Sequence, residues 1–206
     1  MFEGCRGLTS WVVNLPDSLT DASYMFYRCS GLREWNVEMP PSLTKAACMF
    51  SDCTGLTEWT VALPDSLGDA SWMFSSCSGL TKWTVEMPVS LTDASYMFYC
   101  CSGLREWNVE MPVSLTNASH MFCGCTGLTS FNVNIPSGIT DAFGMFGECK
   151  LDYASVERIA KTIPTKSGDR GIITIGIASA DYDRATADFE SMIVNKNWFV
   201  YWESNS

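Results

Sequence analysis

Cysteine has the greatest capacity for chemistry among the residues of this sequence, because a thiolate can attack a substrate, bind a metal ion or form a disulfide. The 206 residues contain ten cysteines, and seven recur at intervals of 24 residues: Cys5, Cys29, Cys53, Cys77, Cys101, Cys125 and Cys149. No Cys-x-x-Cys pair occurs, and the one histidine is His120. With one histidine, the sequence offers almost none of the residues that a His-based zinc site or a Cys–His catalytic pair would need. We predict that the seven regular cysteines point inward as small, reduced core residues.

The other three cysteines, Cys48, Cys100 and Cys123, fall outside this register. Cys100 and Cys123 lie on adjacent repeats, one column apart, so a disulfide between them stays an open alternative. Closely spaced cysteines such as Cys123-x-Cys125 give poor zinc geometry, because one member of the pair is expected to be buried.

Two further columns of side chains could bind metal ions. One consists of Asp21, Lys45, Asp69, Asp93, Asn117 and Asp141, which follow one another every 24 residues. Stacked carboxylates can bind calcium, but a lysine and an asparagine interrupt this column, and a turn-forming or helix-capping role is predicted instead. The other column is methionine, whose fixed register predicts core packing rather than copper binding. The sequence also lacks a phosphate-binding loop, a nucleophile elbow and a metalloprotease helix, so we expect no metal, no cofactor and no enzymatic activity.

These columns imply structural elements that repeat every 24 residues. Six complete units occupy residues 1–144, and each has Met-Phe, Cys, Gly-Leu, an aromatic residue and Pro at fixed positions. Trp35, Val37 and Met39 alternate with polar residues, which is the period of a half-buried strand. Pro40 then ends the strand, because proline cannot donate a hydrogen bond to a sheet.

The rest of each unit predicts a coil that turns corners, since its apolar residues recur every three or four positions. A short second strand or one helical turn is predicted around Met49-Phe50, and glycines such as Gly31 and Gly55 are predicted to serve tight turns. One unit alone buries no stable core, whereas stacked units place Trp on Trp and Cys on Cys. The predicted fold class is a repeat solenoid over residues 1–150, with a parallel β-sheet that takes one strand from each 24-residue coil.

The period stops after Cys149, and residues 151–206 follow a different pattern. Residues 151–163 predict a helix capped by Asp152, residues 172–177 a strand, residues 181–195 a second helix and residues 198–202 a final strand. We predict an α/β C-terminal cap whose strands extend the sheet of the repeats and whose helices cover its outer face. A separate small α/β domain is the alternative.

The repeat unit resembles the BspA-like leucine-rich repeats of the treponemal subclass. The positions that carry this resemblance in one unit are Cys29, Leu32, Trp35, Val37, Met39, Pro40, Leu43, Ala46, Phe50 and Cys53. Trp replaces the usual aliphatic residue before the strand, and Met-Phe replaces Ala-Phe, which is closer to bacterial surface lipoprotein repeats that read Met-Phe-x-x-Cys. The resemblance implies a leucine-rich-repeat-like fold, display at a bacterial surface, adhesion and contact with host proteins.

Charge and hydropathy limit the partners. Thirteen basic against 23 acidic residues give a net charge of −10, which disfavours nucleic acid as a partner. No apolar run is long enough to span a membrane. The N-terminus shows no signal peptide, and Met1-Phe2 is already in phase with the repeat. We therefore expect a piece of a longer secreted or surface protein whose export signal lies upstream.

Two sets of exposed side chains are the candidate binding residues. The first is a variable, mostly aromatic column in which Cys48 stands between ring-bearing residues: Tyr24, Trp72, Tyr96 and His120. The second is polar and lies between the buried strand positions: Glu34, Asn36, Glu38, Lys82, Glu106 and Asn108. Tyr and Trp are enriched at binding hot spots, so we predict a module that binds a protein or a glycan at a cell surface.

Alternatives stay open for each part of this prediction. The rings of the aromatic column could instead pack flat against the neighbouring coil. The module could be a spacer or stalk without a ligand, because units 25–48 and 97–120 differ at only five positions. The N-terminal edge around Trp11-Val12-Val13 lacks a capping element, so self-association through this edge is also expected.

Overall fold

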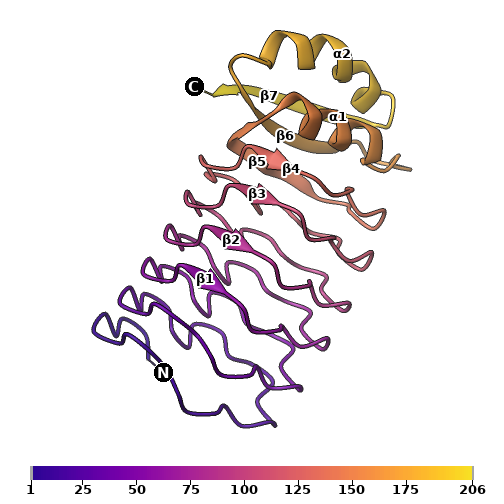
Figure 1. Cartoon of the computed structure of the whole chain (residues 1–206). Coiled ribbons are helices and arrows are strands. Elements are labelled where there is room, and N and C mark those ends of the chain that lie inside the picture. Colours follow the sequence, from indigo (N-terminus) through magenta and orange to yellow (C-terminus); the bar gives the residue numbers. More distant parts are fainter. Residues whose placement is uncertain (1, 206) are drawn as a thin grey trace.

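The chain forms a stack of coils that ends in two helices, as seen in a computed structural model that describes residues 2–205 (Figure 1). The first coil lies at one end of the stack, and α1 and α2 lie at the other. Met1, which the sequence places in the methionine column, lies outside the described residues. Buried side chains form one hydrophobic cluster that extends from Ala22 to Trp198. No helix within residues 2–205 has the length and apolar character needed to cross a membrane.

One side of the stack, here named the turn wall, consists of residues 21–29 and the equivalent segments of the later coils. Its coils are hydrogen-bonded to each other at every second residue: the N–H groups of Ala22, Tyr24 and Phe26 donate to carbonyl oxygens of the next coil, each at 2.9 Å. Single-residue parallel bridges join Asp21 to Lys45 and continue in the same column to Asp141. Around Met49-Phe50 the chain makes consecutive hydrogen-bonded turns, so the predicted short strand or helical turn is wrong there.

The other side, here named the Trp wall, consists of residues 33–41 and their equivalents, and its strands are only two residues long. Strands β1 (Glu58–Trp59) and β2 (Lys82–Trp83) pair in parallel, as do β3 (Glu106–Trp107) and β4 (Ser130–Phe131). These four coils contribute one parallel strand each, as predicted, but the strands form two separate two-stranded sheets and not one sheet that takes a strand from every coil. In several coils the indole N–H donates a hydrogen bond to the carbonyl oxygen two residues further on, as from Trp59 Nε1 to Val61 O at 2.7 Å. That carbonyl oxygen therefore accepts a hydrogen bond from its own coil and not from a neighbouring strand.

Aromatic rings from both walls fill the space between them. The Trp column stacks as predicted, with 6.3 Å between the ring centroids of Trp35 and Trp59 and 6.4 Å between those of Trp59 and Trp83. The phenylalanines of the turn wall form a second column, in which Phe50 and Phe74 are 5.6 Å apart. Trp59 meets Phe74 edge-on at 4.8 Å, so the two columns interlock across the core.

Six of the seven regular cysteines are buried, whereas Cys5 is exposed, so the prediction of an inward side chain is wrong for Cys5. Each buried thiol donates to the carbonyl of a phenylalanine in the preceding coil, as from Cys77 Sγ to Phe50 O at 3.2 Å. The sequence reading of these residues as small apolar groups missed this directional contact.

The repeated glycines allow the coils to approach each other closely. A Cβ atom on Gly55 would lie 2.7 Å from the carbonyl oxygen of Ser30 and 2.9 Å from that of Leu32, both in the preceding coil. The backbone at Gly55 is not in the left-handed region. Gly55 lies in a hydrogen-bonded turn as predicted, because the N–H of Leu56 donates to the carbonyl of Cys53 at 3.0 Å. Since that turn does not need a left-handed residue, close contact between neighbouring coils is the reason for glycine at this position.

The C-terminal segment contains the elements that its sequence pattern predicts. After strand β5 (Ala142–Leu151) come helix α1 (Tyr153–Thr162), strand β6 (Gly171–Ala178), helix α2 (Tyr182–Val194) and strand β7 (Trp198–Asn205). Asp152 caps α1 as predicted, because its carboxylate accepts from the N–H of Ser155 at 2.8 Å. The three strands form a parallel sheet in the order β5-β6-β7.

This sheet continues the turn wall and not the Trp strands, so the predicted position of the cap is wrong. Strand β5 is the last Met-Phe-x-x-Cys segment, and β6 and β7 add to it. Helix α1 instead lies next to β4 in space and is bonded to the last Trp-wall segment. Ser155 Oγ accepts from the N–H of Phe131 at 2.8 Å, and Thr162 Oγ1 accepts from that of Ile135 at 3.0 Å. The helix thus takes the place that a further Trp segment would occupy. The division into residues 1–150 and 151–206 stays a prediction.

Candidate functional site

The aromatic column lies on the turn wall, at a position where the backbone is left-handed in each coil. The φ angles are 60° at Tyr24, 55° at Cys48, 58° at Trp72, 57° at Tyr96 and 54° at His120. A left-handed backbone costs a residue with a Cβ atom about 1–2 kcal/mol, because the Cβ crowds the following carbonyl. The turn imposes this conformation in every coil, whichever residue type stands at the position.

Three rings of the column stack face to face between successive coils. The ring centroids of Trp72 and Tyr96 are 3.9 Å apart with an interplanar angle of 5°, and those of Tyr96 and His120 are 4.5 Å apart at 7°. These three residues are named the aromatic ladder. Tyr24 lies apart from it, since Cys48 interrupts the column, and its ring meets Tyr27 instead. The structure thus brings together three of the four predicted aromatic residues.

Two more rings border the ladder. Tyr99 lies 5.7 Å from Trp72 and 5.6 Å from Tyr96, between ring centroids. Phe143 meets His120 edge-on at 5.0 Å and is 45% exposed. Sequence reasoning missed Phe143, although a signal was present: the equivalent position in the earlier coils holds only Ser or Ala.

His120 closes the ladder at its C-terminal end. Its ring lies over Gly144, where a Cβ atom would be 2.5 Å from the His120 ring carbon Cδ2. Burial lowers the pKa of His120, and the nearby Asp141 opposes this only in part. The imidazole is therefore held in its neutral form at neutral pH. Its Nδ1 atom is buried and has no hydrogen-bond partner within residues 2–205.

The ladder is partly open to solvent. Trp72 is 37% exposed, while Tyr96 and His120 are half-buried. Tyr24, which lies outside the ladder, is 52% exposed. Because the faces of Tyr96 are covered by its two neighbours, the ladder presents mainly ring edges and polar ends. Such a surface combines apolar area with hydrogen-bonding groups, as binding hot spots rich in Tyr and Trp do.

The predicted polar residues lie on the Trp wall and are not part of the aromatic ladder. Each of the six is exposed: Glu34, Asn36, Glu38, Lys82, Glu106 and Asn108. Lys82 lies opposite Glu58 across β2 and β1, and Glu106 lies opposite Ser130 across β3 and β4. The sequence predicted two separate sets of binding residues, and in the structure the two sets occupy two surfaces with the core between them.

The acidic column has the turn-forming role that its position predicted. The carboxylate of Asp69 accepts from the N–H of Ser71 at 3.0 Å, and that of Asp93 accepts from the N–H of Ser95 at 2.8 Å. The same bond recurs from Ser23 to Asp21, from Ser119 to the Asn117 amide oxygen and from Phe143 to Asp141. One oxygen of each of these side chains thus accepts a backbone hydrogen bond within the turn.

Cys100 and Cys123 are free thiols joined only through their backbones, with the N–H of Cys100 donating to the carbonyl of Cys123 at 2.8 Å. Burial raises the pKa of Cys123 to about 11. The thiol of Cys100 lies against Gly124, where a Cβ atom would be 2.7 Å from its sulfur. The fold thus holds Cys123 as a neutral thiol of low reactivity.

Comparison with protein-family models identifies the repeat. The model described as "BspA type Leucine rich repeat region" matches in six copies over residues 1–90 and 70–167. No curated protein and no solved structure matches the chain. The match covers the stacked coils together with strand β5 and helix α1, and it agrees with the parallel pairing of strands from successive coils. The chain therefore belongs to the BspA-type leucine-rich repeat family.

Proposed function

We propose that this chain is the binding module of a bacterial surface protein, that its ligand is a protein or a glycan, and that the aromatic ladder is the contact surface. Regions of the BspA type are surface repeat modules, and leucine-rich repeats generally mediate protein interactions. Export to the cell surface and a role in adhesion are parts of the same proposal.

The observation that carries the proposal is that the fold accepts very small residues where the ladder has rings. Cys48 and Gly144 stand at the same repeat position as Trp72, with the same left-handed backbone. Gly144 adopts that backbone without strain, whereas Trp72 and Tyr96 do not. The turn therefore does not require a ring at this position.

The net stability that the rings provide is small. A stacked aromatic pair contributes about 0.5–1.5 kcal/mol beyond its buried area, and a left-handed backbone costs each ring-bearing residue about 1–2 kcal/mol. Two stacked pairs contribute about 1–3 kcal/mol, whereas three left-handed residues cost about 3–6 kcal/mol, so stacking does not outweigh the strain. Packing alone gives little reason for Trp72 and Tyr96, which favours a role in recognition.

The two most similar repeats differ mainly on the turn wall. Between units 25–48 and 97–120 the changes are Arg28 to Cys100, Pro41 to Val113, Lys45 to Asn117, Ala47 to Ser119 and Cys48 to His120. Four of these five positions belong to the turn wall, and exposed residues of the Trp wall such as Glu34 and Asn36 are unchanged at 106 and 108. In this pair of repeats a spacer would have no need for changes that fall mainly on one wall, so their distribution favours binding over the spacer alternative.

A binding role also agrees with the state of the cysteines. Burial raises the pKa of Cys53 to about 12, and it raises that of Cys77 further. A nucleophilic cysteine requires the opposite shift. The absence of an enzymatic activity therefore stays part of the proposal.

The test is a binding screen with ring-free variants. Purified protein is applied to an array of immobilised oligosaccharides and to a panel of extracellular-matrix proteins. Trp72→Asn combined with Tyr96→Asn removes two rings but keeps a residue that tolerates the left-handed backbone. Val113→Asn, on the Trp wall and 76% exposed, is the control. The proposal requires that the double variant loses at least tenfold in affinity for whatever wild-type protein binds, while the control does not. Equal binding by all three proteins would refute it.

A further inference from the structure

A continuous groove runs along the Trp wall, just after the short strands. Four hollows of 330, 590, 420 and 400 Å³ follow one another from coil to coil. Adjacent hollows share lining residues: Glu38, Met39 and Pro41 join the first two, Ala62, Leu63 and Asp65 the next two, and Glu86, Met87 and Val89 the last two. The hollows thus form one groove parallel to the axis of the stack.

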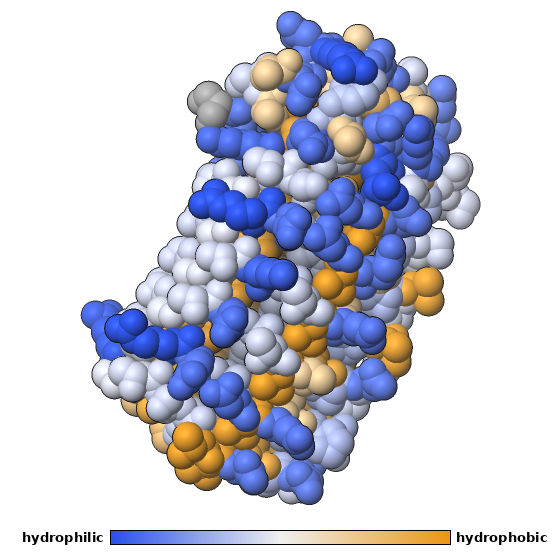
Figure 2. Space-filling model, in the orientation of Figure 1, coloured by the Kyte–Doolittle hydropathy of each residue, from blue (hydrophilic) through white to orange (hydrophobic). Residues whose placement is uncertain are grey.

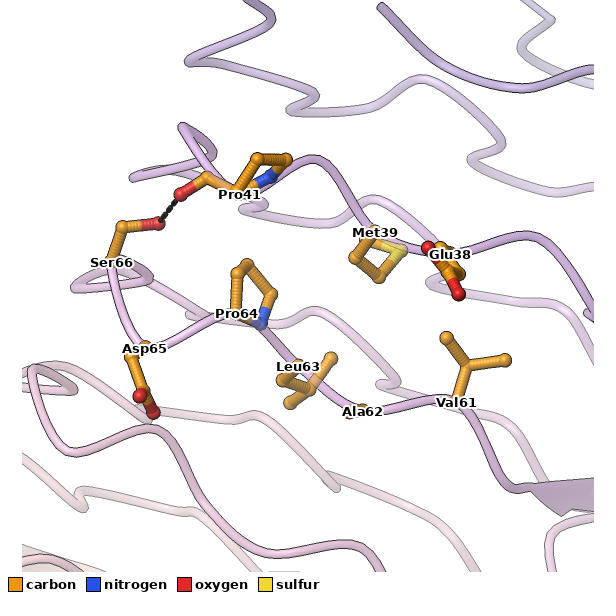
Figure 3. Close-up of a pocket in the computed structure, with 9 residues that line it drawn as sticks. All are labelled: Glu38, Met39, Pro41, Val61, Ala62, Leu63, Pro64, Asp65 and Ser66. Carbon is orange, nitrogen blue, oxygen red and sulfur yellow. Dashed lines mark hydrogen bonds between the residues drawn. The ribbon is translucent and has the colours of Figure 1, made fainter. Parts of the chain in front are cut away.

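The floor of this groove is apolar and adaptable. Met39, Leu63, Met87 and Met111 reach the surface with 5–7% of their area, and Val61 and Val85 are half-buried beside them. Figure 3 shows Glu38 and Met39 of one coil facing Val61, Leu63 and Pro64 of the next. Figure 2 shows that apolar side chains form a stripe along the stack between hydrophilic ones. Methionine side chains adapt readily to the shape of a partner.

Backbone groups in the groove are available to a ligand. Within the described chain, the N–H groups of Val61, Ala62 and Leu63 donate to no protein acceptor, in contrast to the paired N–H groups of the turn wall. The same holds for Val85, Glu86 and Met87 one coil further on. Such groups can donate to the carbonyl oxygens of an extended polypeptide, which are free of internal hydrogen bonds in the polyproline II conformation.

The charge of the groove is entirely negative. Its charged lining residues are all carboxylates: Asp17, Glu38, Asp65, Glu86 and Glu110. None of them is in an ion pair within residues 2–205. Glu38 and Glu86 stand two coils apart, as do Asp17 and Asp65. Two coils span roughly 10 Å. Three residues of an extended chain in the polyproline II conformation span about 9 Å and bring every third side chain to the same side.

We infer that this groove binds an extended segment of a partner protein in which Lys or Arg recurs about every third residue and aliphatic side chains lie between. The basic side chains meet the carboxylates, the aliphatic ones rest on Met39, Leu63 and Met87, and the backbone meets the free N–H groups. A sugar polymer fits less well, because no aromatic ring lines the groove. The groove lies on the Trp wall and the aromatic ladder on the turn wall, so this second binding surface goes beyond the proposed function.

The probes are two synthetic peptides long enough to span four coils: repeats of Lys-Val-Ser and, as the charge-reversed control, repeats of Glu-Val-Ser. Binding to the full chain is measured by fluorescence anisotropy at low and high salt. Glu86→Lys with Glu110→Lys reverses two carboxylates in the groove. Glu3→Lys with Glu190→Lys makes the same change in net charge at exposed residues that do not line it. Glu86→Gln with Glu110→Gln tests the groove without adding positive charge.

We expect the basic peptide to bind wild-type protein, the groove reversal to weaken binding at least tenfold, the glutamine pair to weaken it less, and the matched control to change it less than twofold. Hydrogen exchange should show that the peptide protects the N–H groups of residues 61–63 and 85–87. Trp72→Asn should leave this binding intact, which separates the groove from the aromatic ladder. Failure of the basic peptide to bind wild-type protein, equal binding of the acidic peptide, or equal losses in the two lysine pairs would overturn the inference.

Discussion

Replacement of Gly79 by alanine is the sharpest test of how the coils are held together. A Cβ atom at this position would lie 2.6 Å from the carbonyl oxygen of Thr54 and 2.9 Å from that of Leu56 in the preceding coil. Both neighbours are backbone atoms, so no side chain can move aside. Because the backbone of Gly79 is not left-handed, alanine suits its conformation and the whole cost is the close contact.

The structure sets the size of the effect. The two coils must separate by roughly 0.5 Å to relieve the contact, and crowding of this kind costs about 1–3 kcal/mol. The Thr81 N–H and the Thr57 carbonyl are already 3.2 Å apart, as are the Cys77 thiol and the Phe50 carbonyl. The separation weakens both bonds, at about 0.5–1 kcal/mol each. We therefore expect Gly79→Ala to lower the free energy of unfolding by about 2–5 kcal/mol.

Gly7 provides a matched control, because it has the same position in the first coil. A Cβ atom on Gly7 would meet nothing within 4 Å. Gly7→Ala should therefore be neutral, or stabilising by up to about 1 kcal/mol through the reduced freedom of the unfolded chain. Urea unfolding followed by tryptophan fluorescence measures both variants. Equal destabilisation by the two substitutions would refute the contact between coils as the reason for glycine and would favour the tight-turn explanation.

Three further expectations follow from the same geometry. Ser76→Gly should stabilise the protein by about 0.5–1 kcal/mol, because Ser76 has a φ of 58° in a column where Gly4 and Gly124 occupy the same position, and destabilisation in urea would contradict this. Burial raises the pKa of Cys53 to about 12 from 9.0, so the unfolded chain loses this proton at lower pH than the folded chain. The contribution of Cys53 to stability is therefore full below about pH 9 and falls as the pH rises towards 12. Urea midpoints that stay flat across this range would show that the thiols do not govern stability there. Val12 and Val13 are 84% and 60% exposed on the first coil, so light scattering should detect association that depends on concentration and that Val13→Lys reduces, whereas a monomer at all concentrations would count against a sticky edge.

Much of the fold could be predicted from the sequence, because the repeat places each core residue six or seven times. The Trp column and the inward position of Cys29 to Cys149 follow from the 24-residue period alone. Helix α1 and its Asp152 cap follow from local signals that need no knowledge of the neighbouring coils. In these cases one rule, apolar periodicity or capping, decides the outcome.

The sequence was a poor guide where contacts between coils decide the structure. Gly55 lies in a turn as predicted, but nothing in one unit shows that the preceding coil lies against it and excludes a Cβ atom there. The left-handed backbone at Trp72 runs against the usual preference of bulky residues, so the ring stacking of the aromatic ladder was only partly predictable. The side on which β6 and β7 join could not be read from their own residues. It depends on the hydrogen-bonding edge that the turn wall offers through β5.

The central claim is that the aromatic ladder serves binding and not stability. Its most direct test measures the urea unfolding free energy and the affinity of the same sample of Trp72→Asn combined with Tyr96→Asn. Because asparagine tolerates the left-handed backbone better than Trp or Tyr, relief of strain offsets the lost stacking, and the free energy should stay within about 1 kcal/mol of wild type. Affinity for the ligand found in the binding screen should fall at least tenfold. A loss of several kcal/mol together with unchanged affinity would contradict the claim and would make these rings part of the structural wall.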